Sequence, residues 1–132
     1  STALNKLEKR VGKEKVNLLE ADLTKPNQFE TIKEVDLWHD RAVLHFFTED
    51  KDQLTYFNLL KQKVKSKGYV IIAAFAIGGA EKCSGLPVLQ YNHEMLSQRL
   101  GFDFELKEAI DFTFVNPKGD ERPYIYTLYQ RK

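Results

Sequence analysis

The feature of the sequence that most restricts its fold is a continuous apolar run from Tyr69 to Phe75. A run of this kind is typical of a strand buried on both faces, as in a parallel sheet covered by helices. It follows a stretch in which four apolar residues recur at helical spacing: Leu54, Phe57, Leu60 and Val64. An amphipathic helix that leads into a fully buried strand indicates an α/β protein.

Both ends of this helix carry sequence signals. Thr48 is placed to cap its start, and Glu49 and Asp50 put negative charge in the first turn, where the helix dipole favours it. The segment from Lys61 to Lys65 is rich in lysine, which suits the last turns, and Gly68 is a stop signal. The sequence therefore predicts a long helix from Thr48 through Lys65 that Gly68 closes.

The N-terminal part of the chain repeats the alternation of helices and strands. Its four predicted elements are a helix over Ala3 to Val11 before Gly12, a short buried strand over Val16 to Leu19, a short helix over Pro26 to Ile32, and a strand that starts at Val35 to Leu37 and runs into Asp40. This alternation favours a mostly parallel sheet.

The C-terminal part of the chain has a different pattern. Asn92 is placed to cap a helix that Gly101 ends. Two segments rich in aromatic and β-branched residues follow, Phe102 to Val115 and Tyr124 to Tyr129, with turn residues over 116–120 between them. The sequence thus predicts a single α/β domain over residues 1–132, with a mostly parallel sheet and a C-terminal antiparallel hairpin.

The composition narrows the function. The chain has 132 residues, 42% of them hydrophobic, and its 20 Lys and Arg nearly balance its 19 Asp and Glu, so we expect a globular domain with no nucleic-acid partner. The apolar run from Val70 to Ile77 is too short to cross a bilayer, and the single cysteine, Cys83, cannot form an internal disulfide. We expect a cytoplasmic protein with no membrane partner. With three histidines at no ligand spacing, we expect no metal site.

Four segments carry recognisable motifs: Glu20 to Leu23, Asp36 to Phe46, Lys67 to Ala73 and Lys82 to Pro87. In their order and spacing they resemble a class I S-adenosylmethionine-dependent methyltransferase after its second strand. The first resembles the acidic motif at the end of that family's third strand. The second resembles its fourth-strand motif, commonly Asp-Leu-Val-Val-Ser-Asn-Ala-Val-Leu-His-His, and the third its fifth strand. The fourth is similar to a loop that overhangs the active-site mouth in some members.

The resemblance implies a Rossmann-like methyltransferase sheet that lacks its first two strands. The family's Gly-x-Gly-x-Gly loop and the acid that binds the ribose hydroxyls would both precede Ser1. It implies methyl transfer from S-adenosylmethionine, the cofactor expected for the complete protein, to a small molecule or a protein side chain, and a truncated chain that is inactive alone.

Two alternatives to an active methyltransferase stay open. The first is a catalytically inactive, methyltransferase-like interaction module, which upstream coding sequence for the glycine-rich loop would argue against. The second is another α/β protein, such as a nucleotide-binding dehydrogenase. The terminal hairpin and the acid after the third strand disfavour this second alternative.

For the cofactor, the resemblance implies two residues near the third strand. The carboxylate of Asp22 would accept a hydrogen bond from the adenine amino group, and the backbone N–H of Leu23 would donate to the adenine ring. The alternative for Asp22 is an ordinary cap or a solvated loop acid, because Thr24 and Pro26 follow closely.

His39, Asp40 and Arg41 follow the fourth strand, at the carboxyl edge of the sheet where ligands of open α/β proteins bind. Here the main chain would face the methionine part of the cofactor, which makes His39 a cofactor-binding candidate. Asp40 or His39 could act as a general base, and Arg41 could hold a carboxylate of the substrate or of the cofactor. The alternative is a salt bridge between Asp40 and Arg41, with His39 packed in the core.

Other residues at the predicted site receive structural interpretations. His45 is expected to support the start of the following helix, and Cys83 to lie in a loop without a catalytic role. Adenine and glutamine N-methyltransferases of this fold usually have Asn/Asp-Pro-Pro-Tyr/Phe where this chain has Asp40 to Val43, which argues against those acceptors.

A sheet without its first two strands would leave the strand that starts at Val35 with an unpaired edge. We expect direct pairing of the segment Val16 to Leu19 with it, a homodimer, or a complex with a separate N-terminal segment. A dimer or a two-piece complex is the leading expectation.

Overall fold

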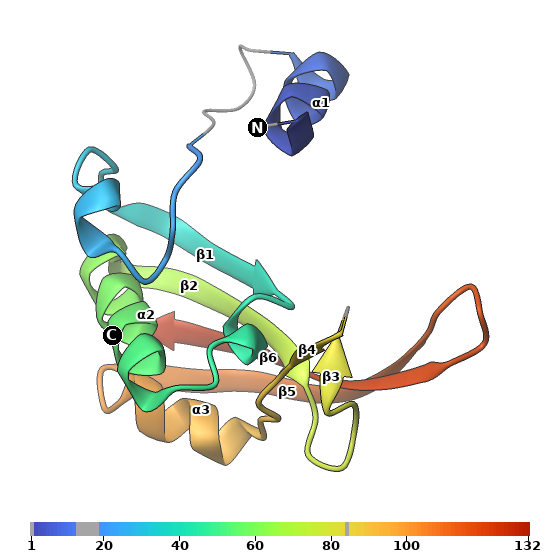
Figure 1. Ribbon diagram of the computed structural model, residues 1–132. Coiled ribbons are helices and arrows are strands. Elements are labelled where there is room, and N and C mark those ends of the chain that lie inside the picture. The colour runs from blue at the N-terminus through green and yellow to red at the C-terminus, as the bar shows by residue number, and fades with distance from the viewer. Residues whose placement is uncertain (1, 13–18, 84) are drawn as a thin grey trace.

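The computed structural model describes residues 2–12, 19–83 and 85–132. Its main sheet has four strands: β1 (Val35–Arg41), β2 (Val64–Phe75), β5 (Phe104–Val115) and β6 (Glu121–Arg131). Their spatial order is β1-β2-β6-β5, with β1 parallel to β2 and β6 antiparallel to both of its neighbours. The predicted α/β class and the C-terminal antiparallel hairpin are confirmed, and the last strand of the chain lies between β2 and β5 (Figure 1).

The N-terminal elements follow the sequence pattern where the structure describes them. Helix α1 (Thr2–Val11) ends at Gly12, whose φ of 87° suits a residue without a side chain. The short helix before β1 is a single 3-10 turn, η1 (Pro26–Phe29). Residues 16–18 of the strand predicted over Val16 to Leu19 lie outside the described residues.

The predicted boundaries of the long helix are wrong at both ends. Helix α2 (Asp50–Lys63) has Glu49 at its N-cap, and no side chain caps it, so Thr48 does not have the expected role. The chain passes directly into β2, and the left-handed φ of 70° falls on Lys67. Gly68 lies inside β2, where an added Cβ would sit 2.9 Å from the carbonyl oxygen of Lys65. Close packing, and not a helix end, requires this glycine.

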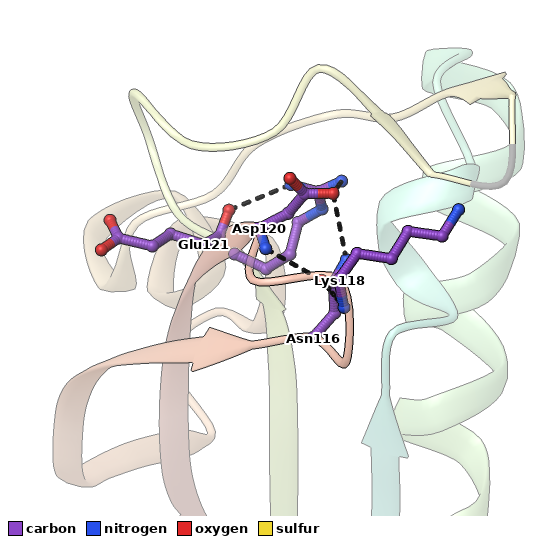
Figure 2. Close-up of polar contacts among 5 residues, drawn as sticks. Asn116, Lys118, Asp120 and Glu121 are labelled. Atoms are coloured by element: carbon purple, nitrogen blue, oxygen red, sulfur yellow. Dashed lines mark hydrogen bonds and ion pairs between the residues drawn. The ribbon is translucent and has the colours of Figure 1, made fainter.

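The C-terminal helix and hairpin agree with the sequence. In α3 (His93–Leu100) the Asn92 side chain accepts a 2.8 Å hydrogen bond from the Met95 N–H, and Gly101 ends the helix with a φ of 83°. The turn between β5 and β6 is built around Asn116, whose side-chain oxygen accepts from the N–H groups of Lys118 (3.0 Å) and Asp120 (2.9 Å) (Figure 2).

Helices cover one face of the sheet, and the other face is partly exposed. Helices α2 and α3 lie on one face (Figure 1), and their apolar side chains form one buried core with Val70, Ile72 and Tyr129 of the sheet. Side chains of the other face stay partly exposed: Leu37 51%, Tyr69 43%, Ile110 50% and Phe112 52%. We call this second surface the open face.

A small two-stranded sheet, β3 (Lys82–Cys83) and β4 (Leu86–Pro87), lies between β2 and α3 in the chain. Cys83 packs against the buried group Ala73, Phe75 and Tyr124. In the described part of the chain, none of the helices has the length and apolar character needed to span a membrane.

Candidate functional site

Asp40 lies near the carboxyl end of β1 and organises the turn that follows. It is 6% exposed, and its carboxylate accepts hydrogen bonds from the N–H groups of Val43 and Leu44, both 3.0 Å, and from the hydroxyl of Tyr56 at 2.6 Å. Both oxygens are therefore occupied. Ala42, which lies between Asp40 and Val43 in the chain, has a φ of 68°, so the carboxylate holds a tight, strained turn.

The electrostatics of this buried group agree with a structural role. Burial raises the pKa of Asp40, and the hydrogen bonds from Tyr56, Leu44 and Val43 oppose that rise. Burial and the neighbouring Asp40 carboxylate raise the pKa of Tyr56 well above 10. The phenol therefore keeps its proton and remains a donor to Asp40, and it accepts a 3.1 Å hydrogen bond from the Trp38 indole.

Arg41 projects to the open face, opposite Asp40, because successive side chains of a strand alternate. Its Nε donates to the hydroxyl of Tyr126 at 2.9 Å, and its guanidinium lies over the rings of Phe114 and Tyr124. The salt bridge between Asp40 and Arg41 that the sequence left open is therefore not formed.

His39 shares the open face with Arg41, two residues away. Its side chain is exposed, so the alternative of a core-packed histidine is wrong. The reason is that β1 alternates, and the apolar position Trp38 beside it turns toward α2.

Asp22 and Leu23 lie in the loop before η1 and have different environments. The Asp22 carboxylate is exposed and accepts from the N–H (2.8 Å) and the hydroxyl (2.7 Å) of Thr24, and these bonds lower its pKa. Both bonds go to Oδ1, so Asp22 closes a local turn with that oxygen. Leu23 is half-buried against the main core.

A groove of about 460 Å³ brings four of the predicted residues together: Leu23, His39, Asp40 and Arg41. It runs along β1 between the loop before that strand and helix α2, and Phe29, Ile32 and Leu59 give it apolar walls. Asp22 is adjacent to Leu23 at one end. The groove thus combines apolar surface, suited to a flat ring, with polar groups at the carboxyl end of a strand.

Three residues of this region had no sequence signal. Tyr56 is on α2, outside the apolar stripe that predicted the helix, yet it is fully buried and donates to Asp40. Tyr124 and Tyr126 come from β6, about eighty residues further along the chain than Arg41. Only the order of strands in the sheet brings them to it.

His45 is fully buried in the short 3-10 turn that follows β1, η2 (Leu44–Phe46). Its ring stacks on Phe75 with centroids 4.4 Å apart, and neither ring nitrogen has a hydrogen-bond partner among the described residues. Burial lowers its pKa to about 4, so the imidazole is neutral. Its backbone carbonyl accepts a 2.7 Å hydrogen bond from the Leu89 N–H, which ties the start of the helix region to the loop after β4. Among residues 2–12, 19–83 and 85–132, no group of His, Cys, Asp or Glu side chains is arranged to hold a metal ion.

Comparison with solved structures decides the fold. The structure matches an S-adenosylmethionine-dependent methyltransferase from Anabaena variabilis with a TM-score of 0.78 and 13% identity over 100% of this chain. This chain has the class I methyltransferase fold. It also matches TehB from Haemophilus influenzae (TM-score 0.67, 17% identity, 99% of this chain) and the N-methyltransferase NodS from Bradyrhizobium japonicum in complex with S-adenosylhomocysteine (0.64, 12%, 98%).

The chain spans only part of these methyltransferases: 65% of the Anabaena protein, 46% of TehB and 61% of NodS. No protein-family model matches the sequence, and no curated protein does. The methyltransferase fold therefore rests on the arrangement of the elements and not on sequence identity.

Proposed function

We propose that this chain forms the C-terminal part of an enzyme that transfers a methyl group from S-adenosylmethionine to a small molecule or a protein side chain. The observation that carries the proposal is the groove along β1, because it collects Leu23, His39, Asp40 and Arg41 at the carboxyl edge of a methyltransferase sheet. In open α/β sheets this edge is where ligands bind.

The residues of the groove fit the chemistry of the cofactor. Asp22 is exposed and ionised, and no hydrogen bond to its Oδ2 is found among the described residues, so this oxygen is available to accept from an adenine amino group. The Leu23 N–H and the backbone at His39 would serve the adenine ring and the methionine part. Leu23, Phe29 and Ile32 offer apolar contact to the ring.

The roles at the end of β1 divide between two neighbours. The role of general base for Asp40, expected from the sequence, does not fit a buried carboxylate whose oxygens accept three hydrogen bonds. We propose instead that Asp40 positions the wall of the site, and that the exposed Arg41 contacts the acceptor. Methyl transfer from a sulfonium is an in-line displacement in which the sulfide leaves without acid catalysis, so positioning is the main contribution required.

Calorimetric titration of S-adenosylhomocysteine tests the proposal. We expect weak or no binding to the 132-residue chain and micromolar binding, about −8 kcal/mol, to a version extended upstream in its own gene. Micromolar binding by the short chain would show that its groove suffices alone. Absence of binding by an extended, folded version would remove the methyltransferase proposal.

A catalytically inactive interaction module is the second candidate. The half-exposed Leu37 and Tyr69 on the open face favour it, since large exposed apolar side chains are typical of protein contacts. The same titration separates the candidates, because an interaction module would not bind the cofactor product in its extended form.

A further inference from the structure

Arg41 presents a pre-oriented guanidinium on the open face. Its Nε donates to the Tyr126 hydroxyl, and its Cζ lies 5.6 Å from the ring centroid of Tyr124 and 5.7 Å from that of Phe114. Among the described residues, Tyr126 is the only hydrogen-bond partner found for this side chain. A planar cation held on rings keeps the fork of its two terminal amino groups available for an anion.

A second guanidinium, that of Arg122, lies near the ring of Tyr124. Burial raises the pKa of the Tyr124 phenol, and the charges of Arg41 and Arg122 both oppose that rise. In the described part of the chain, the ion pair found for Arg122 is the one with Asp120 at 3.9 Å, a distance at which an exposed pair contributes little. Two arginine side chains therefore lie near the Tyr124 ring, whereas the acidic Glu108 lines the surface beyond Ile110 and Tyr126.

An apolar hollow adjoins Arg41 and its supporting rings. Ile110, Phe112 and Tyr126 line an open depression of about 330 Å³. The rings of Phe112 and Tyr126 meet edge to face with centroids 6.0 Å apart. Tyr126 belongs both to the hollow and, through its hydroxyl, to the support of Arg41, so the two features are continuous.

We propose that this part of the open face binds molecules that combine a flat aromatic ring with a carboxylate, the ring over Phe112 and Tyr126 and the carboxylate on Arg41. That these molecules are the methyl acceptors rests on the proposed function, whereas the binding itself needs no cofactor. A carboxylate matches the guanidinium fork in a bidentate pair, and the rings favour offset or edge contact with another ring. Arg122 adds attraction without a direct contact.

The test is an NMR titration of the 132-residue chain with three probes: 2-naphthoate, 2-naphthamide and acetate. We expect 2-naphthoate to shift the Arg41 Nε–H and the backbone amides of Phe112 and Tyr126, and to bind at least tenfold more tightly than either other probe. Arg41→Gln should weaken 2-naphthoate binding by about tenfold to a hundredfold, the range for a charge-assisted hydrogen bond, and leave 2-naphthamide binding unchanged.

Two further variants complete the design. Phe112→Leu should weaken the binding of both naphthyl probes. Arg10→Gln, which removes an exposed arginine on α1, should leave both affinities unchanged. Equal affinity for 2-naphthoate and 2-naphthamide, or an Arg41→Gln variant with an unchanged amide spectrum and unchanged affinity, would overturn the inference. The cofactor titration is a separate measurement. Binding of 2-naphthoate by this chain, together with no binding of S-adenosylhomocysteine by the folded version extended upstream, would remove methyl transfer and keep this site.

Discussion

Asp40 and Arg41 are neighbours in the sequence, but β1 directs them to opposite faces of the sheet. The carboxylate of Asp40 is buried and fully hydrogen-bonded, whereas the guanidinium of Arg41 is exposed and supported by aromatic rings. A reactive group must reach its substrate, and a positioning group must not move. Burial therefore agrees with the two roles that we propose, a positioning role for Asp40 and contact with the acceptor for Arg41.

Asp22 gives the first prediction at this scale. In the protein extended upstream, Asp22→Ala should weaken the binding of S-adenosylhomocysteine by about tenfold, because one charge-assisted hydrogen bond is lost. Calorimetry measures the affinity, and Asp36→Ala, which removes another exposed carboxylate, is the control. The expected melting temperature is nearly unchanged, since Asp22 is exposed. A fall in melting temperature with unchanged affinity would assign Asp22 to its turn with Thr24 alone.

His45 gives a pH dependence. Its pKa is about 4 in the folded chain and ordinarily 6.5, so between these values the unfolded chain binds a proton that the folded chain does not. The free energy of unfolding is therefore unaffected by this group above pH 6.5. As the pH falls from 6.5 toward 4, protonation of His45 in the unfolded chain lowers that free energy by roughly 2–3 kcal/mol.

Urea unfolding of the wild type and of His45→Phe across this pH range measures that contribution. Phenylalanine keeps the stacking on Phe75 and removes the titrating group, so the variant should lose less stability on acidification. The half-exposed His93→Gln is the control and should follow the wild type. Identical pH profiles for wild type and His45→Phe would contradict the assignment.

At the scale of elements, Gly68 shows that a glycine after a helical pattern can mark either a helix end or a close approach of two backbones. Glycine after an amphipathic helix usually marks the helix end, but here α2 ends at Lys63 and the chain continues as a strand. An alanine Cβ at 68 would lie 2.9 Å from the Lys65 carbonyl oxygen and 3.1 Å from that of Asp36. Both are backbone atoms, which cannot move aside as easily as the end of a flexible side chain.

Adjacent substitutions here should therefore have opposite effects. Gly68→Ala should lower the free energy of unfolding by about 1–3 kcal/mol through overpacking between β1 and β2. Lys67→Gly should raise it by up to about 1 kcal/mol, because it relieves a left-handed φ of 70°. Urea denaturation measures the free energy of unfolding of both variants. Two changes of the same sign would show that the backbone around residue 68 can adjust to an added Cβ.

The elements also show how much the sequence could predict. Helices α1 and α3, strand β1 and the terminal hairpin were predictable because spacing, Asn92, Gly101 and the turn at Asn116 are local signals. Motif order also singled out four residues that line one groove, although their roles stay predictions. The contacts of Tyr56 with Asp40 and of Tyr126 with Arg41 were not, because they join residues 16 and 85 positions apart and depend on packing. The exposure of His39 was also missed, because an apolar motif position can fall on the open face.

At the scale of the whole molecule, the uncovered surfaces lie together. Among the described residues β1 has a strand on one side only, and the open face begins at the same edge with Leu37 and His39. An unpaired edge presents backbone groups to another strand, and the apolar side chains beside it gain free energy when they leave water. Because these two effects act at one place, we expect association of the chain there.

Association of the chain through this edge is the last prediction. Light scattering of the purified 132-residue chain should give a mass above the single-chain 15.3 kDa, as a dimer or as a complex with an N-terminal piece found by mass spectrometry. Leu37→Lys places a charge beside the edge and should shift the mass to that of a monomer, since natural edge strands use lysine against pairing. Leu54→Lys on α2 is the matched control, because Leu54 is also 51% exposed, and it should leave the mass unchanged. A monodisperse wild-type monomer without an associated peptide would contradict the prediction, and would mean that the edge of β1 is stable in water.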